Sequence, residues 1–299
     1  MPFFEISKNP ALSIFYLDQG SITAPAILLI HGACCDLHDW NWQVPLLLSL
    51  GYRVITPDLR GHGKSFTPLP TPDIRQWPGP DAISCGIVDF YPNSMGEDNI
   101  RLLDHLKIKS AIIMGHSLGT TVGYYMAAAH PDRVRAYIAI DPYHNRTGAE
   151  WDQVSGAFVE NGSQVFLEWC DANAYNSVNA PAPWRLWWHR RRTLSTPDYV
   201  TAAVAIGGWE AEDSLGRLEN ATAMYRNGGI KCPLLIVGSA EQYVVLDRVL
   251  AEGVEGGLGE VHVVAEYDHW LHQDDGSERF NGILEAWLGK CGLIPKGEK

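Results

Sequence analysis

The residues with the clearest chemical meaning form the pentapeptide Gly115-His116-Ser117-Leu118-Gly119. It follows an apolar run at residues 111–114 and precedes a helical pattern at residues 118–130, so it predicts a sharp turn between a strand and a helix. Glycine at both ends leaves room for a strained turn of this kind. The turn would hold the Ser117 hydroxyl at a helix N-terminus, where free N–H groups favour negative charge. The pattern is typical of a serine nucleophile, which also needs a neighbouring base.

The elements expected around this turn alternate between strand and helix. Short apolar runs, typical of a parallel sheet that is covered on both faces, occur at residues 26–30, 52–56, 111–114, 135–140, 234–237 and 261–265. Helical patterns fall at residues 40–50, 96–106, 118–130, near 246–253 and at 278–288. Residues 3–7 and 13–17 are expected to form an opening antiparallel pair. The alternation predicts an α/β fold, with a mostly parallel twisted sheet flanked by helices.

Two segments interrupt the alternation. Residues 66–92 contain five prolines between positions 68 and 80, which excludes a regular helix or a central strand there. Residues 143–229 show helical spacing and six tryptophans, and they predict an inserted helical cap. The tryptophans either line a pocket or form the core of the cap, and packing is the more common role of large aromatic side chains.

Composition excludes several functional classes. The 299 residues carry a formal net charge of −12, which argues against a nucleic-acid partner. The basic run at residues 189–192 stands beside tryptophans and is interpreted as a solvated helix face. No apolar run is long enough to span a membrane, and the first residues do not resemble a secretory signal, so we expect a cytoplasmic protein without a membrane partner. The sequence does not indicate an oligomeric state.

Cofactor and metal motifs are not evident either. The six cysteines have no zinc-type spacing and are expected to be reduced apolar fillers. His269 and His272 have a spacing that a metal could use, but no carboxylate or further histidine pattern completes a site. No dinucleotide fingerprint follows a strand, so neither a cofactor nor a metal is predicted.

Four motifs in a fixed order resemble the α/β-hydrolase family over nearly the whole chain. His31-Gly32-Ala33 follows the first buried strand and is similar to the family's oxyanion element. Residues 58–65, DLRGHGKS, follow the next strand; Gly115–Gly119 is similar to the nucleophile elbow; and residues 267–270, YDHW, are similar to the catalytic-histidine loop. We expect a structural role for Asp58, which would tie the loop after its strand.

The resemblance implies a Ser117–acid–histidine triad, with the residues in that chain order. His262, His269 and His272 are the late histidines, and His269 matches the family motif because it comes just after the last strand. Glu241 occupies the usual place of the acid, where aspartate is more common, and Asp141 is the alternative because some relatives place the acid after the preceding strand. The backbone N–H groups of Ala33 and Leu118 would form the oxyanion hole.

These expectations combine into one hypothesis about fold and function. An α/β-hydrolase core at residues 1–142 and 230–299 would carry a helical cap at residues 143–229. The small-molecule substrate would be an apolar or aromatic carboxylic ester or lactone, cleaved through an acyl-enzyme. Cys34, His116, Trp184, Trp188 and Trp270 are the predicted substrate-binding residues.

Alternatives on the same fold remain open. One is a non-hydrolytic enzyme, such as a lyase, a carbon–carbon bond-cleaving enzyme or a cyclase; the other is a small-molecule receptor with residual hydrolase activity. Epoxide hydrolases and haloalkane dehalogenases also resemble this chain, but they carry aspartate where Ser117 stands.

Overall fold

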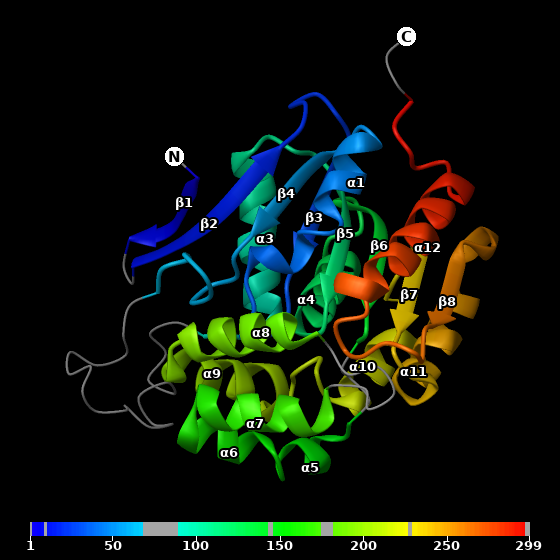
Figure 1. The fold of residues 1–299 in the computed structure, drawn as a ribbon. Helices are drawn as coiled ribbons and strands as arrows, with labels where there is room; N and C mark the ends of the chain where they lie inside the picture. Colours follow the sequence, from blue (N-terminus) through cyan, green and yellow to red (C-terminus); the bar gives the residue numbers. More distant parts are fainter. Residues whose placement is uncertain are drawn as a thin grey trace.

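The computed structural model describes residues 2–8, 11–67, 89–142, 146–174, 182–226 and 229–296. Its centre is an eight-stranded sheet in the order β1-β2-β4-β3-β5-β6-β7-β8 (Figure 1). The strands are β1 (Phe3–Lys8), β2 (Ala11–Gln19), β3 (Ala26–Ile30), β4 (Arg53–Pro57), β5 (Ala111–His116), β6 (Val134–Ile140), β7 (Leu234–Gly238) and β8 (Gly259–Val263). Strand β2 is antiparallel to both its neighbours, and the other neighbouring pairs are parallel. The predicted mostly parallel sheet and its opening antiparallel pair are confirmed.

The central strands are apolar because both faces of the sheet are covered. Side chains alternate between two cores with the period of two that a strand imposes: Leu28 and Ile30 face one core, and Ile27 and Leu29 face the other. Helices α3 (Pro92–His105), α4 (Leu118–Ala129) and α11 (Glu241–Glu252) cover the first face. Helices α1 (Val44–Ser49) and α12 (Ser277–Lys290) cover the second.

The predicted helix at residues 40–50 is wrong in its details. The chain instead forms a 3-10 turn, η1 (Leu37–Trp40), and the short helix α1, which begins at Val44 with Pro45 in its first turn. Proline has no N–H and clashes with the carbonyl of the preceding turn, so a helix can start at Pro45 but cannot run through it. The last strand, expected at residues 261–265, lies two residues earlier because it pairs with β7 from Gly259 onward.

The chain between β6 and β7 forms helices and, over its described residues, no strand. These are α5 (Gly148–Trp151), α6 (Ser155–Asn161), α7 (Ser163–Asn173), α8 (Pro183–Ser195), α9 (Asp198–Ala205), the π-helical turn η2 (Ile206–Glu210) and α10 (Leu218–Arg226). They lie across the end of the sheet to which β7 and β8 point (Figure 1). We call α5 to α10 the cap helices.

Most of the proline-rich stretch lies outside the described residues, and helix α3 begins at Pro92. Within the described part of the chain, no helix combines the length and the apolar character needed to cross a bilayer.

Candidate active site

Ser117 stands at a strained turn between β5 and α4, as the pentapeptide predicts. Its backbone is left-handed, with φ 52° and ψ −117°, which few non-glycine residues adopt. The flanking glycines are required by close contacts: a Cβ atom on Gly115 would lie 2.2 Å from the carbonyl oxygen of Gly119, and a Cβ on Gly119 would lie 2.1 Å from the carbonyl oxygen of Ile30. The packing between β3, β5 and α4 therefore holds the serine in place.

His269 is bonded to Asp141, the residue that follows β6. Nδ1 of His269 donates a hydrogen bond to a carboxylate oxygen of Asp141 at 2.5 Å, and the other oxygen accepts one from the N–H of Ser239 at 2.6 Å. The Asp141 side chain is fully buried. Because Nδ1 carries the proton, Nε2 of His269 is left with its lone pair, which is the form a general base needs.

Glu241, the preferred acid in the sequence analysis, does not lie beside His269. It is the first residue of α11, its side chain is exposed, and it pairs with Arg248 two turns along the same helix, at 2.6 Å. Asp141 occupies the position instead, because it directly follows a central strand whose end meets the histidine loop. The alternative acid is therefore the one that the geometry supports.

The expected oxyanion donors border the same space as the nucleophile. Gly32 and Ala33 line the pocket together with Ser117, and a Cβ on Gly32 would lie 3.1 Å from Cβ of Ser117. Leu118 is the first residue of α4, and no side chain caps that helix end. The assignment of the Ala33 and Leu118 N–H groups as an oxyanion hole stays a prediction. Asp58 accepts hydrogen bonds from the N–H groups of Leu37 and Lys64, which is the predicted structural role.

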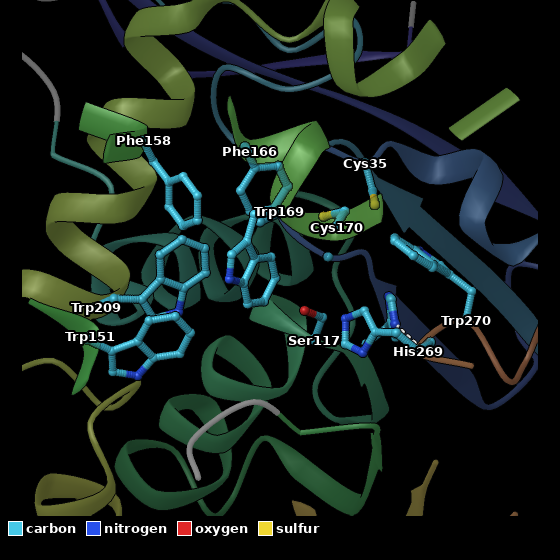
Figure 2. Close-up of a pocket in the computed structure, with 13 residues that line it drawn as sticks. Cys35, Ser117, Trp151, Phe158, Phe166, Trp169, Cys170, Trp209, His269 and Trp270 are labelled. Atoms are coloured by element: carbon cyan, nitrogen blue, oxygen red, sulfur yellow. Dashed lines mark hydrogen bonds between the residues drawn. The ribbon is translucent and has the colours of Figure 1, made fainter. Parts of the chain in front are cut away.

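The pocket around Ser117 has one polar side and one aromatic side (Figure 2). About 410 Å³ of space between atoms belongs to it, including the part that opens to solvent. Ser117 and His269 lie on the polar side. The aromatic side belongs to the cap helices and consists of Trp151, Phe158, Phe166, Trp169 and Trp209. Trp209 stacks on Trp151 with ring centroids 4.9 Å apart, and Phe158 stands edge-on to Trp209.

Two of the five predicted substrate-binding residues, His116 and Trp270, line this pocket. Cys34 does not: its thiol contacts the Thr201 hydroxyl at 3.4 Å, and the neighbouring Cys35 reaches the pocket instead. Burial raises the pKa of the Cys34 thiol to about 12, in keeping with a filler role.

Trp184 and Trp188 are not among the residues that line this pocket either. Trp184 is 53% exposed, and Trp188 borders a surface groove on the outside of α8. Helix α8 turns its other face inward. Tryptophan content alone could indicate an aromatic pocket, but the sequence did not show which tryptophans face it, because the helix orientations were unknown.

Only half of the basic run on α8 is solvated: Arg190 and Arg191 are exposed, whereas His189 and Arg192 are buried. Arg185, His189 and Arg192 are buried and share one face of the helix, being four and seven residues apart. Arg192 pairs with the fully buried Asp39, and Arg185 donates to Asp268 at 2.5 Å. Burial alone would raise the pKa of Asp39, but Arg192 and His116 outweigh it and hold that pKa well below its usual range.

Asp39 also belongs to a group that sequence spacing did not reveal. Asp39, His116 and His272 are buried, and their possible ligand atoms lie within 4.8 Å of one another. The carboxylate and second histidine that the sequence did not supply for His272 thus come from η1 and β5. The Arg192 guanidinium already neutralises Asp39, so the group is first of all part of a buried ion-pair network.

The fold and the site together define a class: an α/β sheet with a serine elbow, a carboxylate-bound histidine and a helical cap. Residues 25–274 match the family model described as the alpha/beta hydrolase fold, and the chain belongs to that family.

Individual relatives cover different parts of the chain. An epoxide hydrolase from Caballeronia sordidicola is 34% identical over 137 residues, which is 46% of this chain and 36% of that protein. The chain thus spans only about a third of that relative. A bifunctional esterase/perhydrolase from Acinetobacter calcoaceticus is 25% identical over 72% of this chain and 77% of its own length. The enol-lactonase structure from Burkholderia xenovorans LB400 has a TM-score of 0.73 at 21% identity, covers 96% of this chain and 100% of its own, and shows the likeness of the fold.

Proposed function

We propose that this protein is a serine hydrolase that cleaves a small apolar or aromatic carboxylic ester or lactone. The observation that carries the proposal is that His269, which is hydrogen-bonded to the buried Asp141, lines the same pocket as Ser117. The three residues come from the ends of two strands and from the loop that follows β8, in the order that a serine hydrolase needs.

The reaction would run in two stages. His269 takes the Ser117 proton as the hydroxyl oxygen attacks the substrate carbonyl, and Asp141 stabilises the imidazolium that forms. The N–H groups of Ala33 and Leu118 would hold the oxyanion. His269 then protonates the leaving alcohol, and the resulting acyl-enzyme is resolved when His269 deprotonates a water molecule.

The aromatic side of the pocket supports an apolar substrate. Apart from the residues of the reacting centre, the lining is dominated by aromatic rings, so it offers few partners for a polar substituent. Burying a polar group there without a hydrogen bond would weaken binding. A flat ring or a short alkyl chain would match the apolar character of these aromatic side chains.

The identity of the nucleophile favours ester chemistry over epoxide or haloalkane chemistry. Ser117 stands where epoxide hydrolases and haloalkane dehalogenases are expected to carry aspartate. A serine cannot form the alkyl-ester intermediate that a carboxylate nucleophile forms. The esterase/perhydrolase relative, matched over most of both chains, supports the same choice.

Labelling with a fluorophosphonate, read by mass spectrometry, tests the proposal. We expect modification at Ser117 alone and loss of labelling in His269→Ala. Ser117→Ala should lose more than ~1,000-fold in the hydrolysis of p-nitrophenyl esters. A folded protein that is not labelled would favour the receptor alternative, and labelling without ester turnover would favour a lyase or another non-hydrolytic enzyme.

A further inference from the structure

Helix α8 has charged side chains on its buried face and large apolar side chains on its exposed face. Its buried face carries Arg185, His189 and Arg192, whereas Trp187 and Leu194 on its outer face are 73% and 48% exposed. Burying two guanidinium groups is costly unless each meets a well-placed partner. Charged side chains in this position therefore indicate that α8 has a specific task at the seam between the cap helices and the sheet.

Arg192 reaches across this seam to Asp39 in the 3-10 turn η1. Both side chains are buried, and the same carboxylate oxygen that pairs with Arg192 accepts a hydrogen bond from Nε2 of Gln273 at 2.8 Å. The second carboxylate oxygen faces the active site. It lies 3.4 Å from the backbone N of Gly32, which donates to it, and 3.6 Å from Nδ1 of His116.

Asp39 thereby contacts the two segments that frame the reacting centre. Gly32 directly precedes Ala33, the expected oxyanion donor, and His116 directly precedes Ser117. Nε2 of His116 also donates to the carbonyl oxygen of His269 at 2.9 Å, and the two imidazole rings are 4.7 Å apart. One buried carboxylate is therefore hydrogen-bonded to the oxyanion loop through Gly32 and lies beside His116, whose Nε2 joins the elbow to the histidine loop.

The cap helices reach the histidine loop directly as well. Arg185 is bonded to Asp268, the residue before His269, and the N–H of His269 donates to the carbonyl oxygen of Ala174 after α7 at 3.0 Å. The backbone around His269 is thus held from the cap side through Asp268 and Ala174, and from the sheet side through His116.

We propose that Arg192 is a positioning residue for the Ser117–His269 site, acting through Asp39 on Gly32 and His116. This inference rests on the proposed function and adds that the cap helps to assemble the reacting geometry. Without the guanidinium, Asp39 would be a buried carboxylate whose charge is unpaired, and it would take up a proton or move away from its partners. Gly32 would then lose its hydrogen bond to the carboxylate, and His116 would lose the negative charge beside its Nδ1.

The test compares the parent enzyme with Arg192→Met, Arg190→Met and the double variant Asp39→Asn/Arg192→Met. Arg190 is the matched control, since it lies on the same helix but is partly exposed and pairs with Asp171 at the surface. For Arg192→Met we expect kcat for p-nitrophenyl acetate and the fluorophosphonate labelling rate to fall about 100-fold with KM changed less than about 3-fold, because small displacements of reacting groups cost about that much. Arg190→Met should match the parent within about 2-fold.

Rescue separates positioning from general destabilisation. The double variant removes both charges, so it should regain about 10-fold in kcat over Arg192→Met. The low-field NMR signal of the Nδ1 proton of His269, identified by its absence in His269→Ala, should shift in Arg192→Met and return in the double variant. This signal reports on the histidine without needing turnover.

Each outcome decides one of the two proposals. A parent that is not labelled at Ser117 contradicts the proposed function, and the NMR signal then still tests Arg192. A folded Arg192→Met with the parent's kcat, labelling rate and His269 signal overturns the positioning role, as does a double variant that is no better than Arg192→Met. If Arg192→Met does not fold, Arg192→Lys keeps the charge but not the planar guanidinium that contacts both Asp39 and His189. A folded Arg192→Lys with the parent's kcat, labelling rate and His269 signal overturns a positioning role for the guanidinium.

Discussion

Asp141 accepts hydrogen bonds from two partners at the end of β6. It ends a buried strand with a left-handed backbone, φ 43°, and its carboxylate binds both the imidazole of His269 and the N–H of Ser239. A buried carboxylate with two such donors has little freedom to rotate, so it fixes the tautomer and the orientation of the histidine. Glu241, only two residues beyond Ser239, is free of this role because its arm follows helix α11 to Arg248.

Exchanging each acid for its amide should separate the two candidates. We expect Asp141→Asn to lower kcat/KM for p-nitrophenyl esters by about 10⁴-fold, because an amide cannot hold Nδ1 of His269 in its protonated form. The control is Glu241→Gln, which removes an exposed ion pair and should leave kcat/KM within about 2-fold. The reverse order of effects would restore Glu241 as the acid.

The ambiguity between these residues has a physical origin that explains how far the sequence could lead. Both follow neighbouring parallel strands, so both are expected at the same edge of the sheet. The buried strands and the elbow follow from local patterns, and these were predicted correctly. Which of two carboxylates turns toward His269 depends on where helix α11 begins, and periodicity does not fix a helix start that closely.

At the scale of elements, the elbow depends on the close approach of α4 to β3. A methyl group on Gly119 would overlap the carbonyl oxygen of Ile30, which belongs to a central strand and cannot move away. The cap shows the opposite situation. The sequence shows helical spacing in the cap, but it does not show which side of a helix is buried. In α8 the buried side carries arginines, because Asp39 and Asp268 pair with them there.

Replacing glycine by alanine should therefore have opposite effects at two helical positions. We expect Gly119→Ala to lower the free energy of unfolding by at least about 3 kcal/mol, because of overlap with fixed backbone. Gly282→Ala in α12 is the control: a Cβ there meets nothing within 4 Å, so it should raise the free energy of unfolding by about 0.5–1 kcal/mol. Urea unfolding followed by circular dichroism measures both. Equal effects would mean that the contact at Ile30 is relieved by movement of the helix.

At the scale of the whole molecule, buried histidines make stability depend on pH. Burial lowers the pKa of His62 to about 3, and it also lowers the pKa of His116, His189 and His272. In the unfolded chain these groups titrate near 6.5. Below that pH the unfolded state binds protons that the folded state does not, so stability is lost as the pH falls.

The free energy of unfolding should consequently decrease between pH 7 and pH 5. His62 alone accounts for a loss of about 2 kcal/mol at pH 5, given the difference between its folded and unfolded pKa values. Urea titrations at the two pH values measure the change. His262, whose side chain is 39% exposed, provides the control, since His262→Gln should leave the change as it is in the parent. Stability that is constant or higher at pH 5 would contradict the argument.

The place where the chain leaves the sheet constrains how the protein could be redesigned. Asp141 is among the last residues before the excursion into helices α5 to α10, so a graft that exchanges these helices can begin just after it and leave the bond to His269 in place. Such a chimaera would nevertheless lack Arg192 and Arg185, which pair with Asp39 and Asp268. A donor segment must bring two arginines on one helical face, seven residues apart, or the recipient must first have both aspartates changed to uncharged residues.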